Sequence, residues 1–221
     1  MLNYVTFSTA FEMQCFIVSL ICLLKDREFS WRIFPSYLFI TCITELIGIY
    51  LRRQHHANQW PYNILLICHV FFTTFMFSNL FGKNVRGKIL LIAGFVILCL
   101  LFSYDLLQHG FLRFNKLTYN AMAVLFTIYS LRYFYIIIKQ DGYSNLKFFA
   151  PFWWVCGVLF FYFGDTAVNL FRGKLSAVMV TPGHALSYYI LIVLNIILYC
   201  CWSYSFICKK WLTKRLETSS L

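Results

Sequence analysis

Six carboxylate or imidazole side chains stand inside stretches of the sequence that are otherwise apolar: Glu12, Glu45, His69, Asp105, Asp165 and His184. Carboxylates and imidazoles can exchange protons, bind a metal ion or form hydrogen bonds to a small ligand. The remaining histidines fall in short polar connections, where solvation accounts for them, and we assign them no role. The six groups are therefore the candidates for chemistry in this chain.

Helical spacing joins several of these groups to further polar residues. Tyr162, Asp165 and Asn169 follow an i, i+3, i+7 pattern, which places them on one face of a helix. A second stripe of residues, each about one turn from the next, is His184, Tyr188, Leu191 and Asn195. Polar stripes on several helices are typical of a binding cavity between them.

The composition tells us what surrounds these groups. Of 221 residues, 61% are apolar and only 12% are charged, whereas a soluble domain carries about 25% charged residues. So little polar surface cannot cover a globule in water, but it suits a chain surrounded by lipid. The net charge of +11 is spread in ones and twos between apolar stretches, a pattern that excludes a nucleic-acid-binding face.

Seven apolar stretches, each near the ~20 residues that cross a bilayer, divide the chain: 4–24, 33–51, 63–81, 89–107, 117–138, 150–171 and 184–208. Pro35, Pro61, Pro151 and Pro182 stand at or just before the starts of four of them, where proline favours a helix start. The fold class predicted is an all-α, polytopic seven-helix membrane bundle. Residues 1–208 form the transmembrane domain, and residues 209–221 form a basic cytoplasmic tail.

The distribution of Lys and Arg predicts the orientation. Twelve lie in the first, third and fifth connections and the C-terminal tail, against six in the other connections, and Arg132 alone lies within a span. Basic residues favour the cytoplasmic side of a membrane. We therefore expect the N-terminus outside and the C-terminus in the cytoplasm, with Arg132 extending its guanidinium toward the cytoplasmic face.

The polar candidates can be grouped by their predicted depth in the membrane. Glu45, His69 and Asp165 each stand six residues from the outer end of their stretch, or about 9 Å at 1.5 Å per residue. We expect these three to face a common interior cavity that opens outward, with His184 near its mouth. Glu12, Asn169 and Tyr188 complete the predicted ligand-binding set. Asp105 lies near the end of its stretch, where contact with water would account for it.

Several chemistries known in seven-helix proteins can be tested against the sequence. A retinal protein needs a lysine in the middle of its last helix, and every lysine here lies outside the apolar stretches. The motifs of G-protein-coupled receptors are also missing. A metal-dependent hydrolase stays open, with His69, Asp165 and His184 as candidate metal ligands, although no His-x-x-x-His spacing supports it.

A small-solute transporter of the three-plus-one-plus-three type is a further alternative. An acidic residue followed by a histidine on the next helix occurs twice, as Glu45 with His69 and as Asp165 with His184. Such a repeated pairing is typical of a parallel structural repeat. The Pro-Gln motif of those carriers is absent.

A short motif adds a family resemblance. Trp60-Pro61-Tyr62-Asn63, preceded by Glu45-Leu46-Ile47-Gly48 in the helix before it, resembles uncharacterised seven-helix membrane proteins of bacteria that accompany sensory histidine kinases. The resemblance implies a sensory or accessory role in a bacterial cytoplasmic membrane. We therefore expect a binding or sensory module that takes a small molecule, ion or lipid and signals through a separate cytoplasmic partner, without a cofactor.

Overall fold

The chain folds into a bundle of long helices. The structure, a computed structural model, describes residues 7–82, 84–139, 146–181 and 183–218, with side chains as far as Trp211. In chain order the elements are α1 (Phe7–Leu23), α2 (Phe29–Arg32), α3 (Phe34–Arg53), α4 (Trp60–Phe81), α5 (Val85–His109), α6 (Lys116–Lys139), the 3-10 turn η2 (Leu146–Phe148), α7 (Ala150–Leu170), α8 (Arg172–Ala177), β1 (Met179–Thr181), β2 (His184–Ala185) and α9 (Leu186–Thr218).

Among the described residues, six helices are long and apolar enough to cross a membrane: α3 with α2, α4, α5, α6, α7 and α9. The first helix, α1, is apolar but shorter, at 17 residues, and residues 4–6 of its predicted stretch lie outside the described residues. Prolines stand in the first turns of α3, α4 and α7, as predicted; Pro182 is not among the described residues. A helical bundle with apolar helices of membrane-spanning length is confirmed, while the seventh span and the orientation stay predictions.

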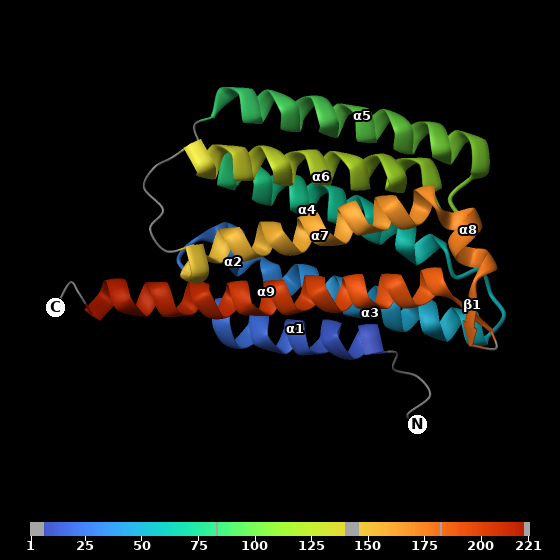
Figure 1. Cartoon of the computed structure of the whole chain (residues 1–221), viewed down its shortest axis with the longest axis horizontal. Coiled ribbons are helices and arrows are strands. Elements are labelled where there is room, and N and C mark those ends of the chain that lie inside the picture. The colour runs from blue at the N-terminus through green and yellow to red at the C-terminus, as the bar shows by residue number, and fades with distance from the viewer. Residues whose placement is uncertain (1–6, 83, 140–145, 182, 219–221) are drawn as a thin grey trace.

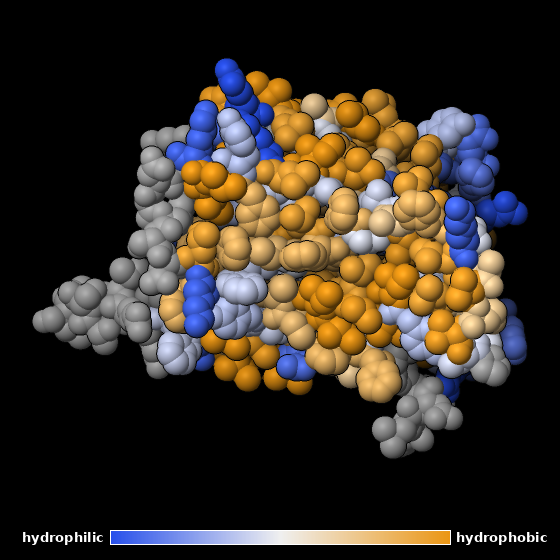
Figure 2. Space-filling model, viewed as in Figure 1, coloured by the Kyte–Doolittle hydropathy of each residue, from blue (hydrophilic) through white to orange (hydrophobic). Residues whose placement is uncertain are grey.

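The long helices form a closed ring. Helix α1 packs against α3 and α9, α9 packs against α7, and α7 packs against α6. Helix α4 closes the ring by contacting α3, α5 and α6, and α5 lies at the edge of the bundle against α4 and α6 (Figure 1). Apolar side chains such as Ile92 and Leu100 on α5 are largely exposed, as expected of a helix that faces lipid. Figure 2 shows this apolar band between two more polar ends.

The connection before α9 differs from the sequence prediction. His184 and Ala185 form a short strand paired with Met179–Thr181, so the last helix begins at Leu186 instead of residue 184. The hairpin lies where Gly183 has a φ of 100°, a conformation that favours glycine. At its other end α9 runs through Cys208 to Thr218. The predicted tail therefore continues the helix, which extends past its neighbours in Figure 1.

Two buried polar residues hold the α5–α6 connection. Asn63, at the start of α4, is fully buried and donates to the carbonyls of Phe111 and Arg113 at 2.8 and 2.7 Å. Its carbonyl accepts from the backbone N–H of Asn115 at 3.1 Å. These bonds tie the connection to α4, so the end of the bundle is fixed by side chains from a distant part of the sequence.

Asp105 is the second of these residues. Contrary to the expectation that it contacts water, Asp105 is only 3% exposed. Its Oδ2 accepts from the backbone N–H and the hydroxyl of Thr118, both at 2.9 Å. A carboxylate at the first turn of a helix satisfies an unpaired N–H and interacts favourably with the helix dipole. Asp105 therefore caps α6, and its role is structural.

Candidate functional site

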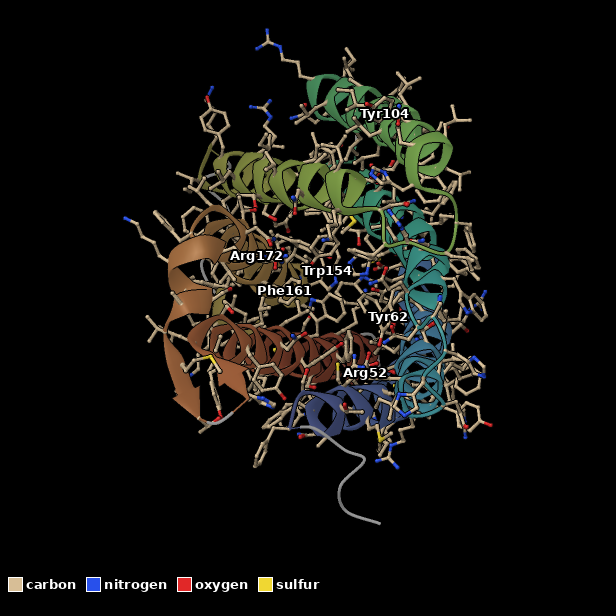
Figure 3. The ribbon with its side chains drawn as sticks, turned by 90° about the vertical axis from the view of Figure 1, so that its right-hand side faces the viewer. Arg52, Tyr62, Tyr104, Trp154, Phe161 and Arg172 are labelled. Carbon is tan, nitrogen blue, oxygen red and sulfur yellow. The ribbon has the colours of Figure 1, made fainter. Side chains whose placement is uncertain are left out.

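A cavity of about 170 Å³ lies within the ring, between α3, α4, α6, α7 and α9. Tyr62 in the first turn of α4 and Phe114 in the α5–α6 connection both line it, so the cavity lies toward that end of the bundle. Half of its sixteen lining residues are Phe, Tyr or Trp: Tyr37, Tyr62, Phe114, Tyr119, Phe161, Tyr162, Tyr199 and Trp202. Figure 3 looks along the bundle from this end, and Tyr62 and Phe161 lie among the surrounding helices.

His69 on α4 is the polar centre of the cavity wall. Its Nδ1 forms a hydrogen bond with the hydroxyl of Tyr37 on α3 at 2.5 Å, and its Nε2 forms one with the hydroxyl of Tyr162 on α7. A neutral imidazole has one N–H donor and one acceptor nitrogen. One tyrosine must therefore donate to His69 while the other accepts from it. The accepting tyrosine keeps its own hydroxyl proton for another partner.

Two of the predicted carboxylates stand behind tyrosines that line the cavity. The hydroxyl of Tyr62 donates to Oε2 of Glu45 at 3.0 Å, and Asp165 lies close to Tyr119 and interacts with its hydroxyl. Neither Glu45 nor Asp165 lines the cavity itself. Glu45 therefore orients a hydroxyl of the wall, and each of the two carboxylates stands behind a tyrosine that lines the cavity.

Gly48 on α3 explains how Tyr62 reaches Glu45. A Cβ atom at position 48 would lie 2.3 Å from the hydroxyl oxygen of Tyr62 and 2.8 Å from its Cζ. No side chain can be placed at that distance, so only glycine leaves room for the ring. The Glu45-Leu46-Ile47-Gly48 segment thus supplies both the acceptor for the Tyr62 hydroxyl and the space for the ring.

The Asp165 side extends to the surface. Asn169, one turn along α7, donates to Oδ2 of Asp165 at 3.1 Å, and Arg172 donates to Oδ1 of Asn169 at 2.7 Å. Asp165 is 3% exposed, whereas Arg172 lies outside. The predicted face of Tyr162, Asp165 and Asn169 is therefore a chain of polar groups from the cavity wall to the bundle end.

Glu12 approaches the same cavity from α1. It is 5% exposed, and its carboxyl lies near the Cys42 thiol and the hydroxyl of Tyr199, which lines the cavity. Its Oε1 has no hydrogen-bond partner among the described residues. The indole Nε1 of Trp202, another residue of the wall, is likewise buried without a partner there. A ligand with polar groups would find unused hydrogen-bonding capacity at this wall.

His184 and Tyr188 lie elsewhere. His184 is exposed in the β1–β2 hairpin, and its ring contacts that of Tyr188 with centroids 4.3 Å apart. Neither residue lines the cavity. The reason is the hairpin, which places position 184 before α9 instead of within it. His184 therefore does not line the cavity, and its position near the mouth stays a prediction.

A metal centre finds no support in the described parts of the chain. They contain no group of three or more His, Cys, Asp or Glu side chains placed to hold a metal ion. His69, Asp165 and His184 are not brought together, and both nitrogens of His69 already form hydrogen bonds with tyrosines. The nine cysteines are free thiols spread over several helices.

Packed aromatic side chains close the bundle on the other side of the cavity. Phe34, at the first residue of α3, lies against Phe72, Phe206 and Trp202 with ring centroids 4.7, 4.8 and 5.2 Å apart. Trp154 and Phe77 continue this cluster, with centroids 5.1 Å apart. Apart from Phe72, every side chain of this cluster is at most 2% exposed. The cavity therefore ends on a dense layer of rings.

Tyr37, Tyr62 and Tyr119 are residues of the candidate site that the sequence pattern did not single out. Tyr37 continues the turn-by-turn stripe of Glu45 and Thr41 on α3, and Tyr62 stands seven residues before His69 on α4. Both spacings were visible in the sequence. Tyr62 and Tyr119 lie near helix ends, where tyrosine is common in the headgroup region, so the sequence alone does not assign them to a cavity.

Comparisons with known proteins give no match: no protein-family model, curated protein or solved structure is similar to the chain. The function must therefore be inferred from the geometry.

Proposed function

We propose that this chain is a seven-helix membrane module that binds one small molecule in the cavity around His69 and passes the binding event along α9 to a cytoplasmic partner. The observation that carries the proposal is the His69 side chain, which joins Tyr37 of α3 to Tyr162 of α7 at the cavity wall. A ligand that changes either hydrogen bond changes the contact between two walls of the ring.

The size of the cavity limits the ligand. An apolar cavity of about 150 Å³ accommodates benzene in another protein, and drug-sized ligands need about 300–1,000 Å³. The 170 Å³ here suits a molecule of one ring. The aromatic wall favours an apolar body, and the buried indole N–H of Trp202, which has no partner among the described residues, favours a hydrogen-bonding group on it.

The signalling half of the proposal rests on α9. Asn195, Leu198, Tyr199 and Trp202 of this helix line the cavity, and the same helix continues to Thr218 beyond the bundle. A shift of α9 at the cavity would therefore move the extension, which carries Lys209, Lys210, Lys214 and Arg215. The aromatic layer beneath the cavity favours a binding module over a transporter, because a transporter must open a path on both sides.

Phenol should bind and stabilise the purified protein. It has one ring and one hydroxyl, so at a hundred times its Kd it would add about 2.7 kcal/mol to the free energy of unfolding. Thermal unfolding in neutral detergent, followed by circular dichroism, measures the rise in Tm. Naphthalene, with two fused rings, should give no comparable rise in Tm at the same concentration in the detergent micelles.

A cavity-filling variant provides the control. Leu65→Phe extends a lining side chain into the cavity, whereas Leu100→Phe makes the same change at an exposed position of α5. The phenol-induced rise in Tm should vanish in Leu65→Phe and persist in Leu100→Phe. An equal rise in both variants would mean that phenol acts through the detergent, and the cavity proposal would fail.

The orientation can be tested separately. We propose that the connection between α3 and α4 faces the outside and the connection between α4 and α5 faces the cytoplasm, because basic residues favour the latter side. Alkaline phosphatase fused after Gln54 should be active, and the same reporter fused after Gly82 should be inactive. The reverse pattern would contradict the outward-facing cavity.

A further inference from the structure

A second, basic site lies at the opposite end of the bundle from the cavity mouth. A groove of about 510 Å³ runs between the first turn of α5 and the last two turns of α6. Its lining residues are Asn84, Val85, Arg86, Arg132, Tyr135, Ile136 and Lys139. Hydrophilic side chains gather at this end in Figure 2, where α5 begins and α6 ends.

One aromatic ring aligns two of the cations. The guanidinium carbon of Arg132 lies 5.2 Å from the centroid of Tyr135, and the ammonium of Lys139 lies 5.5 Å from the same centroid. The three residues follow an i, i+3, i+7 pattern on α6, so they share one face of that helix. Cation–π contacts orient both positive groups along the groove. Arg86 adds a third positive charge from α5.

Nothing of opposite charge lines this groove in the part of the chain that the structure describes. Its lining contains no Asp or Glu, and the ion pair at this end, Lys209 with Glu28 at 2.6 Å, involves α9 and the start of α2 instead. The first turn of α5 adds the partial positive charge of a helix start, with Asn84 accepting from the N–H of Gly87. Among the described residues, the three positive charges of the groove therefore have no counter-charge in its lining.

Arg132 makes the arrangement more than a solvated surface patch. It stands seven residues inside the end of α6, about 10 Å along the axis, and is half-buried at the edge of the apolar band. An arginine at that depth is costly unless it reaches water or an anion. Groove residue Val85 and neighbouring Ile138 are 68% and 79% exposed, so lipid tails would contact the groove directly.

We propose that this groove binds the phosphate group of an anionic phospholipid, held by Arg86, Arg132 and Lys139. A phosphate placed between the three cations receives charge-assisted hydrogen bonds from each, and a guanidinium can bind it in a bidentate manner. The acyl chains would lie along the exposed apolar faces of α5 and α6. Inorganic phosphate could make the same polar contacts but has no acyl chains to lie on the apolar faces. A lipid is therefore the occupant that fits both parts of the groove.

Native mass spectrometry of the full chain in neutral detergent tests the site, with dihexanoyl phosphatidic acid, dihexanoyl phosphatidylcholine and inorganic phosphate as separate probes. Phosphatidic acid should bind most tightly. Arg132→Gln should weaken it about tenfold, the effect of losing one hydrogen bond between charged groups. Arg86→Gln removes an exposed cation at the start of α5 without disturbing the core, and it should weaken binding as well.

The matched control is Lys88→Gln, an exposed cation on α5 that does not line the groove. It should leave the affinity for phosphatidic acid unchanged. Equal weakening by Lys88→Gln and Arg86→Gln would overturn the site, because it would mean that lipid binding depends only on the net charge of the protein. Equal affinity for phosphatidic acid and phosphatidylcholine would also overturn it. If inorganic phosphate bound as tightly as phosphatidic acid, the lipid would be overturned as the occupant.

Discussion

Replacing Asn63 with leucine will lower the free energy of unfolding by about 3 kcal/mol, because each buried backbone group left unpaired costs about 1–3 kcal/mol. Asn63 is fully buried and pairs with three backbone groups of the α5–α6 connection: the carbonyls of Phe111 and Arg113 and the N–H of Asn115. Leucine has nearly the same size and pairs with none of them. The two carbonyls belong to exposed residues and can regain water, which places the effect at the lower end of the range.

Asn79→Leu is the matched control for this change. Asn79 lies on the same helix, α4, but its amide donates only to the carbonyl of Phe75 one turn earlier. We expect a change of less than about 0.5 kcal/mol, as for most surface substitutions. Equilibrium unfolding in mixed detergent measures both variants. Equal losses for Asn63→Leu and Asn79→Leu would show that the α5–α6 connection does not depend on Asn63.

Replacing His69 with phenylalanine will lower the free energy of unfolding by about 2 kcal/mol. Phenylalanine keeps a ring at the cavity wall but leaves the hydroxyls of Tyr37 and Tyr162 without their imidazole partner. Hydrogen bonds between membrane helices contribute about 0.6–2 kcal/mol each. His184→Phe is the control, because His184 is exposed in the hairpin and its loss should have little effect.

A combined variant separates lost hydrogen bonds from lost packing. When Tyr37 and Tyr162 are also changed to phenylalanine, no hydroxyl at the wall depends on His69, and most of the stability should return. Thermal unfolding of the single and triple variants gives the comparison. If the triple variant is no more stable than His69→Phe, then the packing of the imidazole ring, and not its hydrogen bonds, stabilises this part of the bundle.

The long helices and their approximate ends can be predicted from the sequence, because a span must be apolar over about 20 residues and proline often marks its start. The predicted ends of most helices lie within a few residues of those observed. The hairpin formed by residues 179–181 and 184–185 was not predicted, because strands of three and two residues are too short to show an alternating pattern. The extension of α9 past Cys208 was missed because polarity marks the membrane boundary and does not mark the end of a helix.

The candidate site was predictable only in part. Depth identified His69, Glu45 and Asp165, but depth does not say which side chain touches a cavity and which stands behind another residue. The tyrosines between the carboxylates and the cavity depend on helix rotation and on the space that Gly48 leaves for Tyr62. Those are properties of packing between helices. Asp105 illustrates the same limit, because its role as a cap follows from the position of Thr118 on the next helix.

The central claim is that a one-ring ligand enters the cavity and contacts the hydrogen-bonded group of His69, Tyr37 and Tyr162. The most direct measurement is the nitrogen-15 NMR spectrum of protein labelled at its histidine rings, recorded with and without phenol. We predict that phenol shifts the signals of both His69 ring nitrogens, leaves those of exposed His184 unchanged, and has no effect on His69 in the Leu65→Phe variant. Unchanged His69 signals at phenol concentrations that raise the Tm would contradict the account.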